Sequence, residues 1–196
     1  MERKLFYRYL WSAILTSLSS ILCVQVDGII VSHLLGANAF AAIGSLMPLM
    51  QIQLTVCLLI GIGGAVQLAF AVGQNDIART SDIRWTTLIA LVVCSMPLVA
   101  LSVRSGMVAS WFCKSDALLP LAGEYAKVLL LSAPVYMLFQ GSGALVRSEG
   151  FPQRVLVGVV VANCLNIAGD FLFVMVFNAG LAGTAWSTTL STAFVR

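Results

Sequence analysis

The chain has 196 residues, of which 60% are apolar or aromatic (Ala, Val, Ile, Leu, Met, Phe, Trp, Tyr or Cys) and only 10% are charged. Soluble domains carry roughly 25% charged residues, so this composition excludes a soluble globule and indicates that most of the surface faces lipid. The 11 Lys and Arg against 8 Asp and Glu give a formal net charge of +3. The basic residues are scattered, so no nucleic-acid partner is expected.

Six membrane-spanning helices fit the chain, because one span uses about 20 apolar residues. Turn and cap residues, such as those at 36–38 and 73–76, separate the apolar runs. An open backbone has no water to bond in hydrocarbon, so the spans must be helical and the fold class is all-α, a polytopic membrane protein. The predicted helices lie near residues 9–31, 45–72, 85–103, 119–144, 155–176 and 181–196.

The basic residues favour one orientation in the membrane. With a cytoplasmic N-terminus, the outer loops hold only Arg104 and Lys114. Residues 1–8 are therefore predicted to be cytoplasmic, and the protein is expected in the plasma membrane, as in a bacterial inner membrane. The first apolar run has no small-residue cleavage site near its end, so it is predicted to stay as a spanning helix. The eight basic residues on the inner side are Arg3, Lys4, Arg8, Arg79, Arg84, Arg147, Arg154 and Arg196.

Two carboxylates interrupt otherwise apolar spans, Asp27 in the first helix and Asp170 in the fifth. An Asp near the centre of a spanning helix costs about 2.5 to 3.5 kcal/mol, so each of the two needs a partner or a role. In the predicted topology these helices run in the same direction. At about 1.5 Å per residue, Asp27 lies roughly 27 Å and Asp170 roughly 22 Å from the inner ends. Both acids are therefore expected at similar depth, within reach of one cavity.

Polar residues accompany Asp170 along one face of its helix, since Asn163 and Asn166 precede it by seven and four residues. Two carboxylates with amide and hydroxyl oxygens can load and release a proton, or can form a hard-oxygen site for sodium, whereas zinc or copper would need His or Cys. Alternatively, Asp27 caps a helix end and Asp170 only bonds its neighbours. The sixth helix adds hydroxyls that also suit helix packing: Thr184, Ser187, Thr188, Ser191 and Thr192.

Three further features carry less specific predictions. The five cysteines form no C-x-x-C pair and have no nearby His, so they are predicted to pack as small apolar residues. Glycines at 61–64 and 141–143, with Pro48, Pro97 and Pro134, are predicted to loosen or kink the helices that hold them. No nucleophile–base pair or metal-ligand set lies in any span, so no enzyme and no cofactor is expected.

The order of several motifs resembles the multidrug and toxic compound extrusion (MATE) transporters. The matching stretches run over nearly the whole chain, although each one alone is a loose pattern. They are Asp27-Gly28-Ile29-Ile30-Val31, Leu34-Leu35-Gly36-Ala37, Ala41-Ala42-Ile43-Gly44, Gly123-Glu124-Tyr125, Ala133-Pro134, Glu149-Gly150-Phe151-Pro152, Asn163 through Phe171, and Ala182-Gly183-Thr184-Ala185.

The resemblance implies an antiporter that exports small organic, often cationic, compounds in exchange for protons or sodium. It implies two six-helix lobes around a central cavity, of which this chain would be the N-terminal one. The family's cation-binding site in that lobe falls here on Asp27, Asn166 and Asp170, and in some members on a sixth-helix Thr that Thr188 matches in spacing. Some members bend the first helix at a proline, but this chain has no Pro before Pro48, so that bend does not carry over.

The length leaves several readings open. Family members are about twice as long, and this chain stops at Arg196, 16 residues into the predicted sixth helix. The C-terminal lobe is therefore expected to be absent, with the chain acting as a fragment, a truncated product or a half that forms a homodimer. Two other functions remain: a flippase for lipid-linked substrates, which would be expected to place Arg or Lys inside the spans, and a non-transporting remnant or assembly partner. The residues do not choose between proton and sodium.

Overall fold

The computed structural model describes residues 2–177 and 179–194. Every regular element in these residues is helical, which confirms the all-α prediction. Helix bounds are α1 (Glu2–Leu34), α2 (Ala37–Ser45), α3 (Met47–Gly73), α4 (Ile77–Ser102), α5 (Ser105–Phe112), α6 (Leu119–Leu131), α7 (Ala133–Ser148), α8 (Pro152–Phe171), the π-helical η1 (Leu172–Val176) and α9 (Gly180–Phe194).

Four segments of the described chain are long and apolar enough to cross a membrane: most of α1, all of α3, all of α4, and α8 continued by η1. Their mean hydropathy is 1.9 to 2.1, and less than a third of each is buried inside the protein. Helices α6 and α7 together make a fifth candidate span, bent by 55°. The sixth predicted span corresponds to α9, which has 15 described residues; residues 195 and 196 of that prediction lie outside the described chain.

The bend between α6 and α7 falls inside the helix predicted over 119–144. Ser132 ends α6, and Pro134 lies in the first turn of α7, where its missing N–H would have been an unpaired donor in any case. The hydroxyl of Ser132 donates to the carbonyl of Leu129 at 3.1 Å, as serine often does where a helix bends. The predicted effect of Pro134 is therefore visible, whereas Pro97 lies inside the continuous α4.

The structure also contains more helix than the sequence predicted. Helix α4 begins at Ile77 and not near 85, because the carboxylate of Asp76 caps it by accepting from the Arg79 backbone N–H at 3.0 Å. The short helices α2 and α5 occupy segments that were predicted as loops. Each buries small or branched apolar side chains against the protein core, Ala39 and Ala42 in α2 and Val108 and Ala109 in α5.

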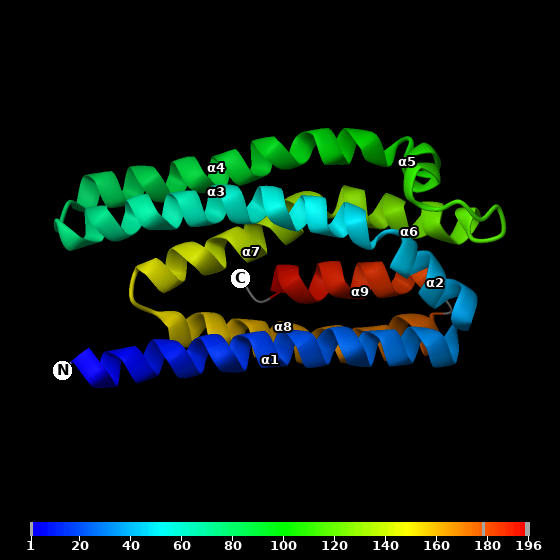
Figure 1. Cartoon of the computed structure of the whole chain (residues 1–196), viewed down its shortest axis with the longest axis horizontal. Helices are drawn as coiled ribbons and strands as arrows, with labels where there is room; N and C mark the ends of the chain where they lie inside the picture. Colours follow the sequence, from blue (N-terminus) through cyan, green and yellow to red (C-terminus); the bar gives the residue numbers. More distant parts are fainter. Residues whose placement is uncertain (1, 178, 195–196) are drawn as a thin grey trace.

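The helices form two groups that lie along each other (Figure 1). Helices α1 and α8 pack side by side, α3, α4 and α7 make the second group, and α9 contacts α6, α7 and α8. The N-terminus, the turn at 74–76 and the turn at 149–151 lie at one end of the molecule, while α2, α5 and the start of α9 lie at the other (Figure 1). Successive long helices therefore run in opposite directions, as a multi-pass protein requires.

The glycines of α3 and α7 allow close contact between helices, where the sequence predicted looser helices. A Cβ added to Gly61 would lie 3.0 Å from the Cα of Gly141, so the two backbones touch at this point. One turn later, a Cβ on Gly64 would collide with the side chain of Thr87 in α4. Both glycines lie within an uninterrupted α3, and small residues at such crossings are typical of membrane helix packing.

Candidate functional site

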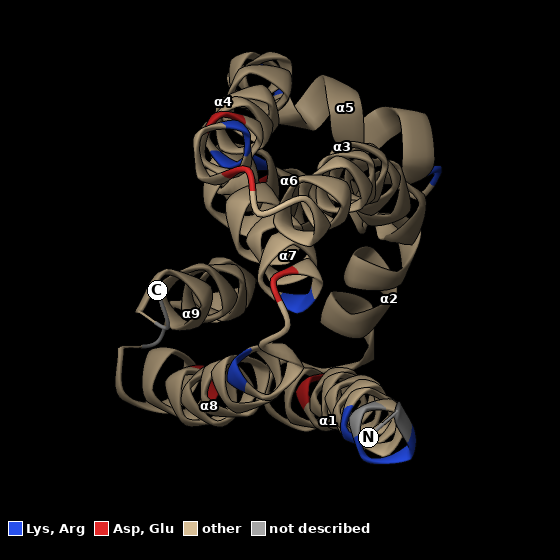
Figure 2. Ribbon diagram, turned by 90° about the vertical axis from the view of Figure 1, so that its left-hand side faces the viewer, with Lys and Arg blue, Asp and Glu red and all other residues tan. Residues whose placement is uncertain are grey.

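The four residues predicted to form a cation site come from three helices that pack in a row, α1, α8 and α9. Asp27 lies in the last third of α1, Asn166 and Asp170 lie in the last two turns of α8, and Thr188 lies in α9. In the end-on view, acidic positions mark the neighbouring helices α1 and α8 (Figure 2). The structure thus brings together residues that are far apart in the sequence.

Asn166 is the centre of the cluster. Its side chain is 4% exposed, and its amide lies between the other groups. With the amide nitrogen turned toward α1, it donates to the two carboxylate oxygens of Asp27 at 3.1 and 3.0 Å. The amide oxygen then accepts from the backbone N–H and the hydroxyl of Thr188, at 3.2 and 3.0 Å. This one side chain therefore connects all three helices.

Asp170 is the most deeply buried acid, at 1% exposure. Within the described chain, its Oδ1 atom has no hydrogen-bond partner, which is unusual because a buried polar atom without a partner costs free energy. The carboxyl groups of Asp27 and Asp170 lie within hydrogen-bonding reach of each other. A bond between them requires that one carries a proton, because two carboxylates have only acceptors. The Oδ1 atom of Asp170 is therefore available to bind a proton or a cation.

The hydroxyl-rich face of α9 makes mostly local bonds. The hydroxyls of Thr184, Ser191 and Thr192 donate to carbonyls three or four residues earlier in their own helix. Ser187 differs, because its hydroxyl donates at 2.8 Å to the backbone carbonyl of Asn166 in α8. Ser187 therefore fixes the position of Asn166, a role that sequence reasoning did not single out from the stripe.

Cys23 is a second residue that sequence reasoning missed, because it was assigned to apolar packing with the other cysteines. Its side chain is buried, and its Sγ lies 3.3 Å from the amide of Asn166 and 3.9 Å from both carboxylate oxygens of Asp27. The spacing contained the signal, since Cys23 precedes Asp27 by four residues and so shares its helix face. In contrast, Asn163 lies outside the cluster and donates to the hydroxyl of Ser19 at 2.8 Å.

The cluster suits a hard, small cation better than a transition metal. Its oxygen atoms come from two carboxylates, an amide and a hydroxyl. Carboxylates can take up a proton, and all of these oxygens are ligands that sodium and other hard ions prefer. In the part of the chain that the structure describes, no group of three His, Cys, Asp or Glu residues is placed to hold a metal ion.

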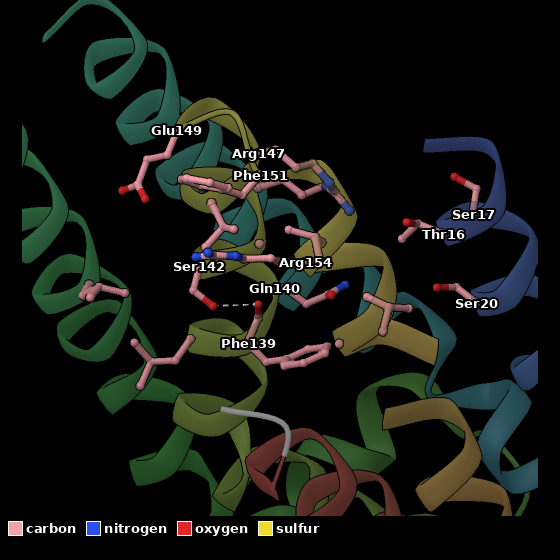
Figure 3. Close-up of a pocket in the computed structure, with 18 of the residues that line it drawn as sticks. Thr16, Ser17, Ser20, Phe139, Gln140, Ser142, Arg147, Glu149, Phe151 and Arg154 are labelled. Atoms are coloured by element: carbon pink, nitrogen blue, oxygen red, sulfur yellow. Dashed lines mark hydrogen bonds between the residues drawn. The ribbon is translucent and has the colours of Figure 1, made fainter. Parts of the chain in front are cut away.

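A cavity of about 1070 Å³ lies apart from this cluster, between α1 and α8 on one side and α3, α4 and α7 on the other. It includes hydroxyls of α1 and two guanidinium groups, those of Arg147 and Arg154, beside the turn that joins α7 to α8 (Figure 3). Asp27, Asn166, Asp170 and Thr188 do not line it. The chain therefore has an acidic cluster and a separate basic cavity.

Comparison with known families gives a match over most of the chain. The family model described as MatE matches residues 12–172. Among curated proteins, the multidrug export protein MepA of Staphylococcus saprophyticus is 23% identical over 156 residues, which cover 79% of this chain and 35% of that protein. MepA of Staphylococcus haemolyticus is 21% identical over 178 residues, covering 90% of this chain and 39% of that protein. The chain thus spans well under half the length of these relatives.

Solved transporter structures have the same fold. A MOP-superfamily transporter from Pyrococcus furiosus superposes with a TM-score of 0.90 at 24% identity, over 98% of this chain and 42% of that one. The outward-facing conformation of a multidrug resistance MATE transporter gives a TM-score of 0.89 at 24% identity, over 98% of this chain and 43% of that one. The arrangement of helices α1 to α9 is therefore the same fold as in these structures, over less than half of each of them.

Proposed function

Because this chain belongs to the MATE family of transporters and corresponds to its N-terminal lobe, we propose that it serves cation-coupled export of small organic, often cationic, compounds. Its curated relatives are named as multidrug export proteins. Residues Asp27, Asn166, Asp170 and Thr188 bind the coupling ion, and the second lobe comes from another chain segment or from a second copy. The observation that carries the proposal is the buried Asp170 Oδ1 atom, which lacks a partner in the described chain and lies beside the Asp27–Asn166–Thr188 network.

Binding of the coupling ion offsets the free-energy cost of burying the two acids Asp27 and Asp170. A proton on one carboxyl group supplies the missing donor for a bond between Asp27 and Asp170. Sodium instead accepts electron pairs from both carboxylates and from nearby amide and hydroxyl oxygens. In either case the loaded cluster holds one positive charge more than the empty one, so loading lowers the electrostatic cost of burying Asp170. The cluster with the ion bound therefore favours a different packing of α1, α8 and α9 from the cluster without it.

The amide of Asn166 distinguishes the two states, because its nitrogen has acceptors in both orientations, whereas its oxygen faces the acceptor oxygens of Asp27 unless the nitrogen points toward that carboxylate. With nitrogen toward Asp27, it donates to the carboxylate, as an empty site requires. Turned by 180°, its nitrogen donates to the hydroxyls of Thr188 and Ser187, at 3.0 and 3.4 Å, and its oxygen faces Asp27. The second orientation adds an oxygen ligand on the side where sodium binds. Rotation of one amide therefore accompanies loading by sodium.

The proposed orientation follows the charge distribution. Arg79 and Arg84 lie in the first third of α4, and Arg147 and Arg154 flank the turn at 149–151. Both segments belong to the end of the molecule that holds the N-terminus (Figure 1), whereas Arg104 and Lys114 flank α5 at the other end. The positive-inside rule assigns the first end to the cytoplasm of a plasma membrane. In this orientation the substrate leaves the cytoplasm while the coupling cation moves inward.

Drug accumulation in efflux-deficient bacteria tests the function. We expect lower accumulation in cells that express the chain joined to the C-terminal lobe of a MepA relative, with membrane levels of protein checked by immunoblot. Asp170→Asn in the joined protein abolishes the effect, and Asp27→Asn weakens it severely. Asp82→Asn, which changes an exposed acid of α4, is the matched control and leaves export unchanged.

The unjoined chain gives a second readout. Lower accumulation with the short chain alone, dependent on Asp170, indicates a half that forms a homodimer, whereas activity of only the joined form indicates a lobe that needs its partner. Unchanged accumulation in both forms at normal membrane level would reject drug export and leave a lipid-linked substrate flippase or a non-transporting partner. Full export by both acid variants would reject the assigned cation site.

A further inference from the structure

The cavity between α1, α8 and the α3–α4–α7 group combines an apolar interior with a basic mouth. Its walls include Leu58, Leu88, Ile89, Val92 and Leu138 from three different helices. The residues beside the α7–α8 turn, in contrast, include the charged Arg147, Glu149 and Arg154 and the aromatic Phe151 (Figure 3). Its volume of about 1070 Å³ is at the upper end of the range for small-molecule sites.

The charges at the mouth do not cancel. Glu149 lines the cavity, but its carboxylate forms a salt bridge with Arg84, in which Oε1 lies 2.7 Å from the guanidinium Nη2. The charges of this pair therefore cancel. Neither Arg147 nor Arg154 forms a salt bridge with a described residue. The guanidinium of Arg154 stacks 4.2 Å from the ring centre of Phe151, which fixes its plane but leaves its charge. Two positive charges therefore remain at the edge of an apolar space.

Other donors at this mouth also suit an anion. The hydroxyls of Ser17 and Ser20 line the α1 side of the cavity (Figure 3) and make no hydrogen bond within the described chain. Helix α8 begins at Pro152 without a side-chain cap, and its first turn lines the cavity through Arg154 and Val155. The positive end of the helix dipole adds to the attraction for an anion.

We propose that this cavity binds an anionic phospholipid of the surrounding bilayer, with the phosphate diester between Arg147 and Arg154 and one acyl chain along the apolar wall. The guanidinium plane matches two phosphate oxygens, and the apolar wall takes the chain that a free phosphate lacks. A cationic drug is repelled by the same two arginines, so this ligand differs in chemical class from the proposed export substrates. The site sits at the predicted cytoplasmic end, where anionic lipid heads are available.

Quenching of Trp85 fluorescence measures occupancy, because Trp85 is the tryptophan that lines this cavity. The whole chain, with Trp11, Trp111 and Trp186 changed to Phe, is reconstituted in phosphatidylcholine vesicles that contain either brominated phosphatidylglycerol or brominated phosphatidylcholine. We expect phosphatidylglycerol to quench at a lower mole fraction. One basic residue contributes roughly fivefold in affinity for anionic lipid, so Arg147→Gln or Arg154→Gln raises the required fraction about fivefold, and both changes together raise it roughly 25-fold.

Two controls separate this site from general surface charge and from free phosphate. Arg79→Gln removes an exposed charge at the same end of the protein that does not line the cavity, and it should leave quenching unchanged. Arg147→Lys keeps the charge and should retain about half or more of the preference, which also shows that substitutions here fold. Added inorganic phosphate should not relieve quenching at millimolar concentration.

Three results would overturn the proposal: equal quenching by the two lipids, an effect of Arg79→Gln as large as that of Arg147→Gln, or displacement of the lipid by inorganic phosphate alone. The last result would assign the arginines to a phosphate site without a lipid chain. Transport is not measured in these vesicles, so a negative result does not bear on the proposed exporter.

Discussion

The amide of Asn166 joins α1, α8 and α9, so replacing it by leucine, a residue of similar size, tests how much that network contributes to stability. The change removes two contacts to the Asp27 carboxylate, at 3.0 and 3.1 Å, and two contacts from Thr188, at 3.0 and 3.2 Å. Hydrogen bonds between membrane helices average about 0.6 kcal/mol and reach about 1.7 kcal/mol. Taking the upper value for the two carboxylate bonds and the mean for the other two gives a loss of roughly 4 to 5 kcal/mol. Apolar packing of leucine recovers about 1 kcal/mol, which leaves about 3 to 4 kcal/mol.

The free energy of unfolding is measured on the purified chain by titration with sodium dodecyl sulfate in mixed micelles, followed by circular dichroism. Asn163→Leu is the matched control, because it removes an amide one turn earlier on the same helix that makes one neutral bond, to Ser19 at 2.8 Å. Its expected loss is about 0.6 kcal/mol. A double-mutant cycle with Asp27→Asn isolates the charged contact, and we expect a coupling energy of about 1.5 kcal/mol.

Equal losses for Asn166→Leu and Asn163→Leu would refute this reasoning, since they would mean that the carboxylate contact adds nothing. A coupling energy below about 0.5 kcal/mol, the usual error of additivity, would do the same. Either result would imply that Asp27 finds its hydrogen bonds elsewhere.

Three further changes test other parts of the structure in the same unfolding assay. Asp170→Asn should raise the free energy of unfolding by about 1 to 3 kcal/mol, because it replaces a buried acid whose Oδ1 lacks a described partner; the stabilised variant should fail to export drug in the joined protein. Gly61→Val should lower it by about 1 to 3 kcal/mol through overpacking, whereas Gly63→Val, with nothing within 4 Å of its added Cβ, should change it much less. Asp76→Ala removes the cap on the Arg79 N–H and should cost about 1 kcal/mol; no loss would show that the cap is dispensable.

The proximity of Asp27, Asn166 and Asp170 could be predicted from helix depth and spacing, whereas Thr188 was added from the family resemblance. Asn166 and Asp170 are four residues apart in one helix, and the depth of Asp27 followed from counting residues from the inner end. The structure places these groups together, while their role as an ion site stays a prediction. Cys23 was missed because its chemistry alone favours packing, although its spacing of four residues from Asp27 indicated a shared helix face; its contact with the Asn166 amide depends on how α8 packs against α1.

The short helices were harder to predict because they depend on contacts between distant segments. Helices α2 and α5 are too short to be stable alone and exist because they cover the apolar ends of the longer helices. The basic cavity mouth was missed for a similar reason. Arg147 and Arg154 lie in different helices, and the turn between them, in which Gly150 has a φ of +93°, brings both side chains to one opening.

The contact between α1 and α8 also has a consequence for how the chain is made. Asp27 is synthesised roughly 140 residues before Asn166, and at about 5 to 20 residues per second a ribosome needs roughly 7 to 28 seconds to cover that interval. During this time α1 is in or near the lipid with its acid separated from the amide that later binds it. Newly inserted α1 therefore has an acid that lacks its later hydrogen-bond donor for several seconds, and faster completion of α8 should increase the yield of folded protein.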